Sequence, residues 1–332
     1  MRVGTFLRTW FRGGGVSRHT LELVERLTDV EWVCFGHGFE TEVPTPIEVA
    51  GVPGPPAVKD VANLARSPWL IDQLREDHDL DLFHAQDTNT LGHDIVTVHS
   101  CFPAYAHAEL SQLYTLVHPM YHKNLVSQKL VLENTDGLIV AVSEDLREDL
   151  LDFYDLDPTQ VRVVYNGVDL EAFHPDVDGS PIRREHGIDP ETPLLSFVGH
   201  EYERKGFDDI LQALTRLPDE VELLTVGGGD HEPWKARARE LGVADRVTWA
   251  GYVPDEQLPA HYAASDVFVF PTRYESFGLV VLEAMATGTP TVAGDLACIR
   301  EFFTDGEHGH LVEPGDVDDL AEAAVRTLGP DG

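Results

Sequence analysis

Short apolar runs alternate with amphipathic helical patterns from one end of the chain to the other, and this alternation constrains the fold most. A strand that is buried on both faces reads as a continuous apolar run, and a helix between two such strands lets them pair in parallel. The pattern therefore predicts an α/β protein built from mostly parallel sheets. The expected strands are residues 3–7, 32–35, 82–85, 95–99, 138–142 and 161–165, then 194–198, 222–226, 247–250, 267–270 and 291–293.

The two series of strands predict two domains, each with a doubly wound, Rossmann-like sheet. Single cores stop growing at roughly 250 to 300 residues, and this chain has 332. An irregular stretch, residues 176–193, separates the series, so we expect domains at 1–175 and 176–332. Four apolar residues recur with helical spacing after the first strand of the second series. They are Phe207, Ile210, Leu211 and Leu214.

The balance of acidic and basic residues limits the partners of the chain. Its 58 Asp and Glu against 24 Lys and Arg give a net charge of −34, and both halves are acidic. Such a surface repels phosphate backbones, so we expect no nucleic-acid partner. Self-repulsion weakens a compact state unless counterions screen it, which favours a protein from an acidic, halophilic proteome. An acidic surface that only aids solubility is the alternative.

Nothing in the sequence predicts export or a membrane span. The first residues hold no apolar segment of signal-peptide length, and no run approaches the roughly 20 apolar residues that cross a bilayer. Cys34, Cys101 and Cys298 are too scattered for a disulfide framework or a zinc site. We expect a cytoplasmic protein, with peripheral contact at the inner membrane face left open.

Residues 271–290 are the most informative segment, because an apolar strand leads there into a helix. Ser276 is placed to cap that helix, and the first amide groups of a helix form an anion site. Glu275 stands just before the helix and Glu283 about two turns into it. A carboxylate can accept two hydrogen bonds from a vicinal diol such as that of ribose. The expected amide donors are those of Phe277, Gly278 and Leu279.

Glu275, seven intervening residues and Glu283, within the sequence ESFGLVVLEAMATGTPTV, resemble the signature of the retaining glycosyltransferases of family 4, or group 1. That family has the GT-B fold, in which two doubly wound Rossmann-like domains face a central cleft, and the cleft is then the expected site. The resemblance implies that Glu283 holds the ribose of a donor and Glu275 the hydroxyls of its sugar. The helix amides would then meet the diphosphate. Exposed helix-end charges are the alternative for both glutamates.

A basic loop extends this resemblance. Gly199 at the end of a predicted strand, followed by residues 203–206, resembles the family's strand and loop, whose Arg and Lys clamp the nucleotide diphosphate. Arg204 and Lys205 match those two cations and suit a dianionic leaving group. The family often has Arg directly after the glycine, whereas this chain has His200. Two solvated loop cations are the alternative interpretation.

The first domain contributes a glycine-rich turn and histidines. Gly14 and Gly15 follow the first predicted strand and resemble the family's loop that lets the donor phosphate and the acceptor approach the backbone. A dinucleotide-binding fingerprint fails here, because no glycine stands at the third required position. His99 matches the family's Thr-x-His position, which implies contact with the donor sugar or the acceptor. His84 lies at the end of another strand, and a buried structural role is the alternative for both histidines.

The resemblance implies a retaining hexosyltransferase that moves a sugar from a nucleotide-diphosphate sugar to an acceptor hydroxyl. The acceptor is left open between a glycan, a lipid-linked sugar and a small molecule. No cofactor and no metal are expected, because Arg204, Lys205 and helix amides already neutralise the diphosphate. The acid pairs at residues 79–81 and 155–157 occur by chance in so acidic a chain. A sugar-nucleotide epimerase and a non-catalytic sugar-nucleotide-binding protein of the same architecture are the alternatives.

Overall fold

The computed structural model describes residues 1–12, 14–53, 56–109 and 118–329. The chain divides into two compact units, Met1–Asn166 and Gly167–Gly332. The predicted boundary after residue 175 falls inside the second unit. Phe173 explains the difference, because its side chain is buried in the core of that unit with its ring 6.1 Å from the ring of Tyr262.

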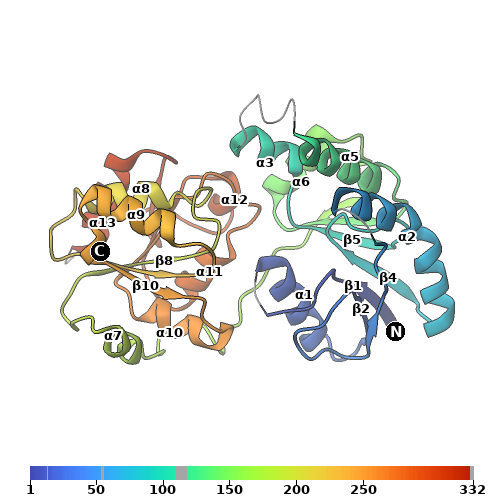
Figure 1. The fold of residues 1–332 in the computed structure, drawn as a ribbon, viewed down its shortest axis with the longest axis horizontal. Coiled ribbons are helices and arrows are strands. Elements are labelled where there is room, and N and C mark those ends of the chain that lie inside the picture. Colours follow the sequence, from blue (N-terminus) through green and yellow to red (C-terminus); the bar gives the residue numbers. More distant parts are fainter. Residues whose placement is uncertain (13, 54–55, 110–117, 330–332) are drawn as a thin grey trace. The chain divides into compact units, whose positions relative to one another are not determined.

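The described part of the first unit contains a seven-stranded parallel sheet (Figure 1). Its strand order is β3-β2-β1-β4-β5-β6-β7, so the chain reverses its winding direction beside β1, as in a doubly wound sheet. The strands are β1 Arg2–Phe6, β2 Glu31–Gly36, β3 Pro46–Glu48, β4 Leu82–Gln86, β5 Ile95–Val98, β6 Leu138–Ala141 and β7 Val161–Val163. The helices are α1 Gly15–Arg26, α2 Pro56–His78, α3 Phe102–Glu109, α5 Pro119–Glu133 and α6 Glu144–Phe153.

The second unit contains a six-stranded parallel sheet in the order β10-β9-β8-β11-β12-β13. Helices α8, α9 and α13 cover one face of it, and α7 and α10 lie on the other (Figure 1). The strands are β8 Leu194–Val198, β9 Glu222–Val226, β10 Val247–Gly251, β11 Val267–Phe270, β12 Thr291–Gly294 and β13 Gly309–Val312. The helices are α7 Ser180–His186, α8 Phe207–Leu214, α9 Glu232–Leu241, α10 Leu258–Ala263, α11 Leu279–Ala286, α12 Ala297–Arg300 and α13 Val317–Leu328, with 3-10 turns η1 Ala244–Arg246 and η2 Asp255–Gln257.

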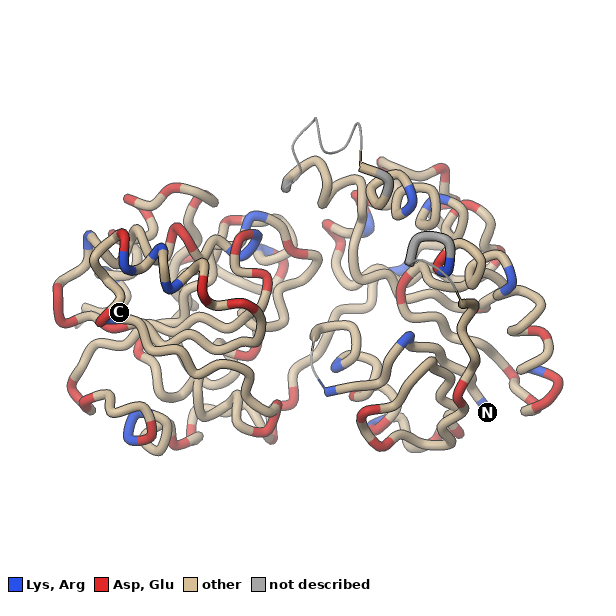
Figure 2. Tube along the Cα trace, viewed as in Figure 1, with Lys and Arg blue, Asp and Glu red and all other residues tan. Residues whose placement is uncertain are grey.

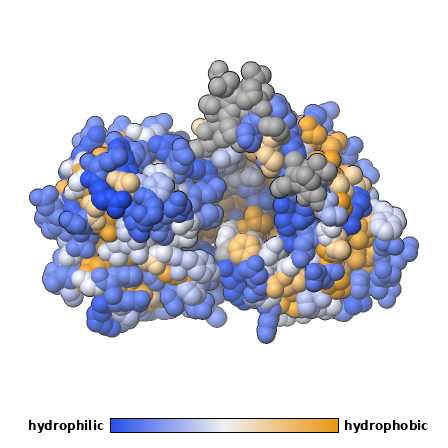
Figure 3. Space-filling view, viewed as in Figure 1, coloured by the Kyte–Doolittle hydropathy of each residue, from blue (hydrophilic) through white to orange (hydrophobic). Residues whose placement is uncertain are grey.

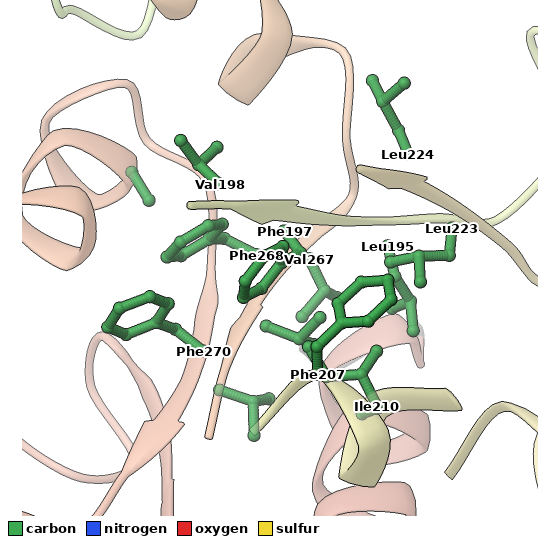
Figure 4. Close-up of a cluster of buried hydrophobic side chains, with 14 of the residues drawn as sticks. Leu195, Phe197, Val198, Phe207, Ile210, Leu223, Leu224, Val267, Phe268 and Phe270 are labelled. Atoms are coloured by element: carbon green, nitrogen blue, oxygen red, sulfur yellow. The ribbon is translucent and has the colours of Figure 1, made fainter. Parts of the chain in front are cut away.

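The core of the second unit confirms why its apolar runs form strands. All residues of β8 and β11 are buried, as expected for strands covered on both faces. The four apolar residues predicted for one face of α8 are each at most 1% exposed. Figure 4 shows Phe207 and Ile210 of α8 beside Phe197, Phe268 and Phe270 of the sheet. Each fully buried side chain of this size contributes about 1.5 to 3 kcal/mol.

Three expectations about the elements are wrong. The stretch expected to be irregular contains α7, and the short strands β3 and β13 lie at sheet edges where no strand is predicted. Both edge strands are only three or four residues long and mix polar with apolar residues, so they carry little periodic signal. They extend the sheets without changing which strands lie at the centre.

The surface agrees with the acidic composition. Asp and Glu are spread over the traces of both units (Figure 2), and hydrophilic residues cover most of the face shown in Figure 3. In the part of the chain that the structure describes, no helix is both long and apolar enough to span a membrane. Because all strand pairs in each sheet are parallel, the carboxyl ends of β8, β9 and β11 meet at one edge, where most of the predicted residues of this unit lie.

Candidate active site

Two loops of the second unit, one after β8 and one after β11, are packed against each other. Gly206 has φ +71°, and a Cβ there would lie 2.3 Å from the carbonyl oxygen of Pro271. Only glycine tolerates both this conformation and this contact. The backbone N–H of Arg273 also donates to the carbonyl of Arg204 over 3.1 Å. This packing joins the predicted basic loop to the loop that carries Glu275.

Lys205 lies in the wall between these loops. Its side chain is only 8% exposed, and its Nζ lies 5.2 Å from the centre of the Phe270 ring. It crosses Gly199, where an added Cβ would approach the Lys205 Cδ to 2.7 Å. Among the described residues, no hydrogen bond or ion pair within 4 Å joins the ammonium to an acceptor. Burial lowers the pKa of Lys205, an effect that the charge of Glu275 opposes.

Arg204 is held by two carboxylates. Its Nη1 lies 3.0 Å from Glu275 Oε1 and also donates to the carbonyl of Tyr274, while Nη2 donates to Glu201. Although burial alone would lower it, the charges of Glu275 and Glu201 raise the pKa of Arg204. The structure thus brings together Arg204 and Glu275, which were predicted separately. Glu201 was not predicted, and its only sequence signal is its place after the strand and Gly199-His200.

The predicted cap of the helix after Glu275 is wrong. Helix α11 begins at Leu279, and its N-cap is Gly278, which has φ +93°, so Ser276 lies too far upstream to cap it. The left-handed conformation of Gly278 turns the chain into the helix without a side-chain cap. Phe277 is buried against Phe302, with ring centres 5.1 Å apart. The predicted role of the amides of Phe277, Gly278 and Leu279 toward an anion stays a prediction.

Glu283 is deeply buried. Its side chain is 1% exposed on α11, and its Oε2 accepts a 2.9 Å hydrogen bond from the hydroxyl of Tyr262. Tyr262 is itself fully buried. Glu283 also lies close enough to Lys205 for its charge to favour the ammonium form. The structure therefore gives Glu283 a supporting contact in the core, and its contact with ribose stays a prediction.

The loop after β9 completes this edge of the sheet. Gly227 has φ +147°, and a Cβ there would lie 1.8 Å from the carbonyl oxygen of Gly199. The glycine-rich turn at residues 227–229 therefore touches the end of β8 directly, backbone against backbone. His200 follows Gly199 at this edge with an exposed side chain. The predicted residues Gly199, His200, Arg204 and Lys205 thus lie on one continuous loop.

The first unit brings together three histidines near the carboxyl ends of β4 and β5. His99 Nε2 lies 3.1 Å from Gln86 Oε1, and its ring is 4.9 Å from that of His19 on α1. His84 Nε2 lies 2.8 Å from Thr97 Oγ1. Burial lowers the pKa of His99 to about 3 and the pKa values of His19 and His84 to about 4. These imidazoles are therefore neutral near pH 7 and can each accept a hydrogen bond.

The predicted glycines of the first unit precede α1. Gly14 is its N-cap, with φ +77°, and Gly15 is its first residue. The preceding Gly13 lies outside the described residues. Both described glycines are exposed, so backbone at the start of α1 is open to a ligand.

Asp87 is a residue that the sequence reasoning missed. It follows β4 directly and has φ +58°, a conformation that non-glycine residues rarely adopt outside functional sites and turns. Its Oδ1 accepts a 3.2 Å hydrogen bond from the backbone N–H of His99. Burial raises the pKa of Asp87 to about 6. Its place after a buried strand is the signal that could have found it.

Two family models match the chain, one in each unit. A family model described as Glycosyltransferase Family 4 matches residues 13–172, and one described as Glycosyl transferases group 1 matches residues 179–328. A D-inositol 3-phosphate glycosyltransferase of Xylanimonas cellulosilytica is 35% identical over 218 residues, which are 63% of this chain and 52% of the relative. The D-inositol 3-phosphate glycosyltransferase of Mycobacterium sp. strain KMS is 37% identical over 209 residues, which are 61% of this chain and 47% of the relative. The chain thus spans about half the length of the curated relatives it matches.

Solved structures cover nearly the whole chain. WaaG, a glycosyltransferase involved in lipopolysaccharide biosynthesis, has a TM-score of 0.85 at 20% identity and covers 98% of this chain and 90% of its own. HepE of Anabaena in complex with UDP-glucose has a TM-score of 0.79 at 19% identity, with coverages of 99% and 90%. At this identity the structures establish the GT-B fold. The two family models, which together match most of both units, show that this chain belongs to the family 4, group 1 glycosyltransferases.

Proposed function

We propose that the protein transfers a sugar from a nucleotide-diphosphate sugar to an acceptor hydroxyl, with retention of configuration and without a metal. The observation that carries this proposal is the burial of Lys205 without a hydrogen-bond acceptor among the described residues. A buried ammonium without a close partner is costly, and such groups occur where a ligand supplies the missing charge. A diphosphate supplies it.

The surrounding geometry supports a diphosphate at this edge of the sheet. Arg204 lies beside Lys205 in sequence and keeps guanidinium donors beyond those bound to Glu201 and Glu275. The turn at residues 227–229 lacks side chains, so a nucleotide can approach its backbone. HepE binds UDP and UDP-glucose in its solved complexes, so a uridine nucleotide is the first donor to test.

The proposed reaction needs no protein nucleophile. The bond between the anomeric carbon and the phosphate oxygen breaks, and its electron pair leaves with the diphosphate. Lys205 and Arg204 meet that growing negative charge, which stabilises the transition state more than the bound donor. The acceptor oxygen bonds to the anomeric carbon on the same face, and its proton passes to the departing phosphate oxygen.

The other predicted residues bind and orient in this proposal. Glu275 accepts hydrogen bonds from hydroxyls of the donor sugar while Arg204 fixes its carboxylate. Neutral His99 contacts the sugar or the acceptor. Glu283 holds the ribose, or supports Lys205 from the core, and the two roles differ in whether the donor touches it. His200 of the second unit, and Gly14 and Gly15 of the first, are each proposed to contact the phosphates of the donor.

The test compares Lys205→Met with Lys235→Met. Lys235 lies on α9 of the same unit, where it forms an ion pair with Glu232, and it serves as the matched control. Isothermal titration calorimetry with UDP should show binding to the parent chain and to the control, and a loss of tenfold or more for Lys205→Met, since a charge-assisted contact contributes about 1.5 to 3 kcal/mol. Equal UDP affinity in all three proteins would refute the proposed donor site.

A second measurement identifies the reaction. UDP-glucose labelled in the sugar is incubated with a panel of acceptors, and products are separated by chromatography. A transferase yields labelled glycoside and UDP. Conversion of the donor to another nucleotide sugar would instead identify an epimerase. A donor that stays unchanged with every acceptor would indicate a non-catalytic sugar-nucleotide-binding protein. Either outcome would refute the proposed activity.

A further inference from the structure

The amide of Gln86 joins two of the buried histidine rings of the first unit. Gln86 is the last residue of β4, and its side chain is 1% exposed. Its Oε1 lies 3.1 Å from His99 Nε2, and its Nε2 lies 3.4 Å from His84 Nε2. An amide has one acceptor and one donor end, so it can hold two imidazoles in different protonation patterns.

The register of two adjacent parallel strands brings these groups together. Gln86 of β4 is the partner of Thr97 in β5. His84 stands two residues before Gln86, and His99 two residues after Thr97. Because side chains alternate between the faces of a sheet, all four lie on the same face. The contact between the amide and the rings therefore follows from the pairing of β4 with β5.

The hydroxyl of Thr97 sets the direction of this chain of hydrogen bonds. Its Oγ1 lies 2.8 Å from His84 Nε2, and the described residues offer this hydroxyl no other hydrogen bond. When the hydroxyl donates, His84 Nε2 carries a lone pair and also accepts from the Gln86 amide N–H. The amide oxygen then faces His99, whose Nε2 must carry the proton. The opposite amide orientation would leave the buried Thr97 proton without an acceptor in the described chain.

Gln86 is the only group among the described residues that forms a hydrogen bond with the ring of His99. The ring of His19 approaches it edge-on, with centres 4.9 Å apart and planes at 70°. Asp87 accepts the backbone N–H of His99 and not a ring N–H. No other neighbour in this part of the chain thus selects which ring nitrogen is protonated.

The second ring nitrogen of His99 is available to a ligand. With the proton on Nε2, Nδ1 carries a lone pair, and no described residue forms a hydrogen bond with it. His99 is only partly buried, and Nδ1 is not among the buried polar atoms that lack a partner. Burial lowers the pKa of His99 to about 3, so this lone pair is not lost to protonation near pH 7.

We propose that Gln86 is a positioning residue, which holds His99 as the tautomer with the proton on Nε2, so that Nδ1 accepts a hydrogen bond from a substrate hydroxyl. This inference rests on the proposed function, in which His99 contacts the donor sugar or the acceptor. A hydroxyl that donates to Nδ1 is held in one orientation, with its oxygen lone pairs directed away from the ring. Without Gln86 the two tautomers interconvert, and part of the protein presents a proton at Nδ1 instead.

The first experiment detects the tautomer directly and needs no substrate. The whole chain is labelled with ¹⁵N histidine, and two-bond correlation spectra distinguish a protonated from an unprotonated ring nitrogen. The spectrum of His99→Phe identifies the signals of His99 by difference. In the parent chain they should show a protonated Nε2 and an unprotonated Nδ1. In Gln86→Met both signals should move toward the average of the two tautomers.

The matched control is Gln212→Met, which makes the same change on α8 of the second unit, where the Gln212 amide donates to Asp208. It should leave the signals of His99 unchanged. An unchanged circular dichroism spectrum, with unchanged signals of the histidines outside the cluster, shows that Gln86→Met is folded.

The second experiment tests whether Gln86 acts through His99. Gln86→Met should lower kcat/KM for sugar transfer by about three- to tenfold, the effect of one neutral hydrogen bond. His99→Phe should lower it at least as much. The double variant should be no slower than His99→Phe, because the amide has no effect once the imidazole is absent. Losses that multiply in the double variant would overturn the inference.

The measurement on the parent chain decides the inference even where a variant fails to fold. A protonated Nδ1 of His99 in the parent chain would overturn it, and so would unchanged signals of His99 in folded Gln86→Met. Absence of sugar transfer by the parent chain would instead refute the proposed function. The two failures are distinguishable, because the tautomer is measured without donor or acceptor.

Discussion

Replacing Tyr262 with phenylalanine should destabilise the second unit by breaking one buried contact. The Tyr262 hydroxyl donates over 2.9 Å to Glu283, and both side chains are at most 1% exposed. A hydrogen bond to a charged group contributes about 1.5 to 3 kcal/mol, and the carboxylate left behind is not reached by water. We expect the free energy of unfolding to fall by about 2 kcal/mol. For a unit of this size that lowers Tm by about 4 to 8 °C.

The assay is urea unfolding followed by circular dichroism, with differential scanning calorimetry for Tm. Tyr252→Phe is the matched control, because the same atom is removed at a tyrosine that is 61% exposed, and its effect should stay within about 0.5 kcal/mol. A double-mutant cycle with Glu283→Gln should give a coupling of about 1 kcal/mol or more. A loss of stability no larger for Tyr262→Phe than for the control would refute the structural role assigned to this contact.

Tyr262→Phe and a further variant, Glu283→Ala, separate the two roles open to Glu283. If the donor touches Glu283, Glu283→Ala should lower the UDP affinity more than Tyr262→Phe does, because Tyr262→Phe keeps the carboxylate. If Glu283 acts only from the core, both variants should be less stable than the parent chain but bind UDP with nearly the same affinity as the parent chain. Calorimetric titration with UDP distinguishes these results.

Four further outcomes are expected. Glu275→Ala should lower turnover more than it raises the donor KM, since its contacts strengthen as charge develops; steady-state kinetics in which only KM changes would contradict this. The three buried histidines have pKa values of about 4, 4 and 3 instead of 6.5, so the unfolded chain binds more protons and stability should fall as the pH drops from about 6.5 toward 4. His84→Gln should flatten that dependence in urea unfolding at several pH values. Activity should persist after exhaustive treatment with EDTA; complete loss that manganese or magnesium restores would show that a metal is needed. Tm should rise between low and molar potassium chloride, because salt screens the repulsion between acidic residues. A constant Tm would instead indicate that the acidic surface only aids solubility.

The sequence predicts the central strands because their signal is local. Strand β11 is apolar at every position and β8 at every position except Ser196, a pattern that a sheet covered on both faces accommodates. The edge strands β3 and β13 lack this signal, and their pairing depends on neighbours far away in the chain. The boundary near Phe173 depends likewise on its contact with Tyr262, which lies 6.1 Å away only in the folded chain.

In the candidate site, too, some features could be predicted from the sequence and others could not. Residue identities that carry a family pattern, such as Glu275 and Lys205, could be selected from the sequence. The ion pair between Arg204 and Glu275 could not, because it depends on packing of two loops 71 residues apart. The Ser276 cap failed because the conformation of Gly278 starts the helix later than the pattern suggests. Asp87 was not predicted, because its unusual backbone conformation cannot be seen in the sequence.

The side-chain conformation of Arg204 is fixed by contacts within the protein, before the proposed reaction begins. A free arginine side chain carries about 2 kcal/mol of rotamer entropy, which a ligand normally removes on binding. Here Glu201, Tyr274 and Glu275 hold the guanidinium, so that entropy is lost during folding. The donor therefore meets a rigid cation, and the guanidinium should occupy the same position in free and bound proteins.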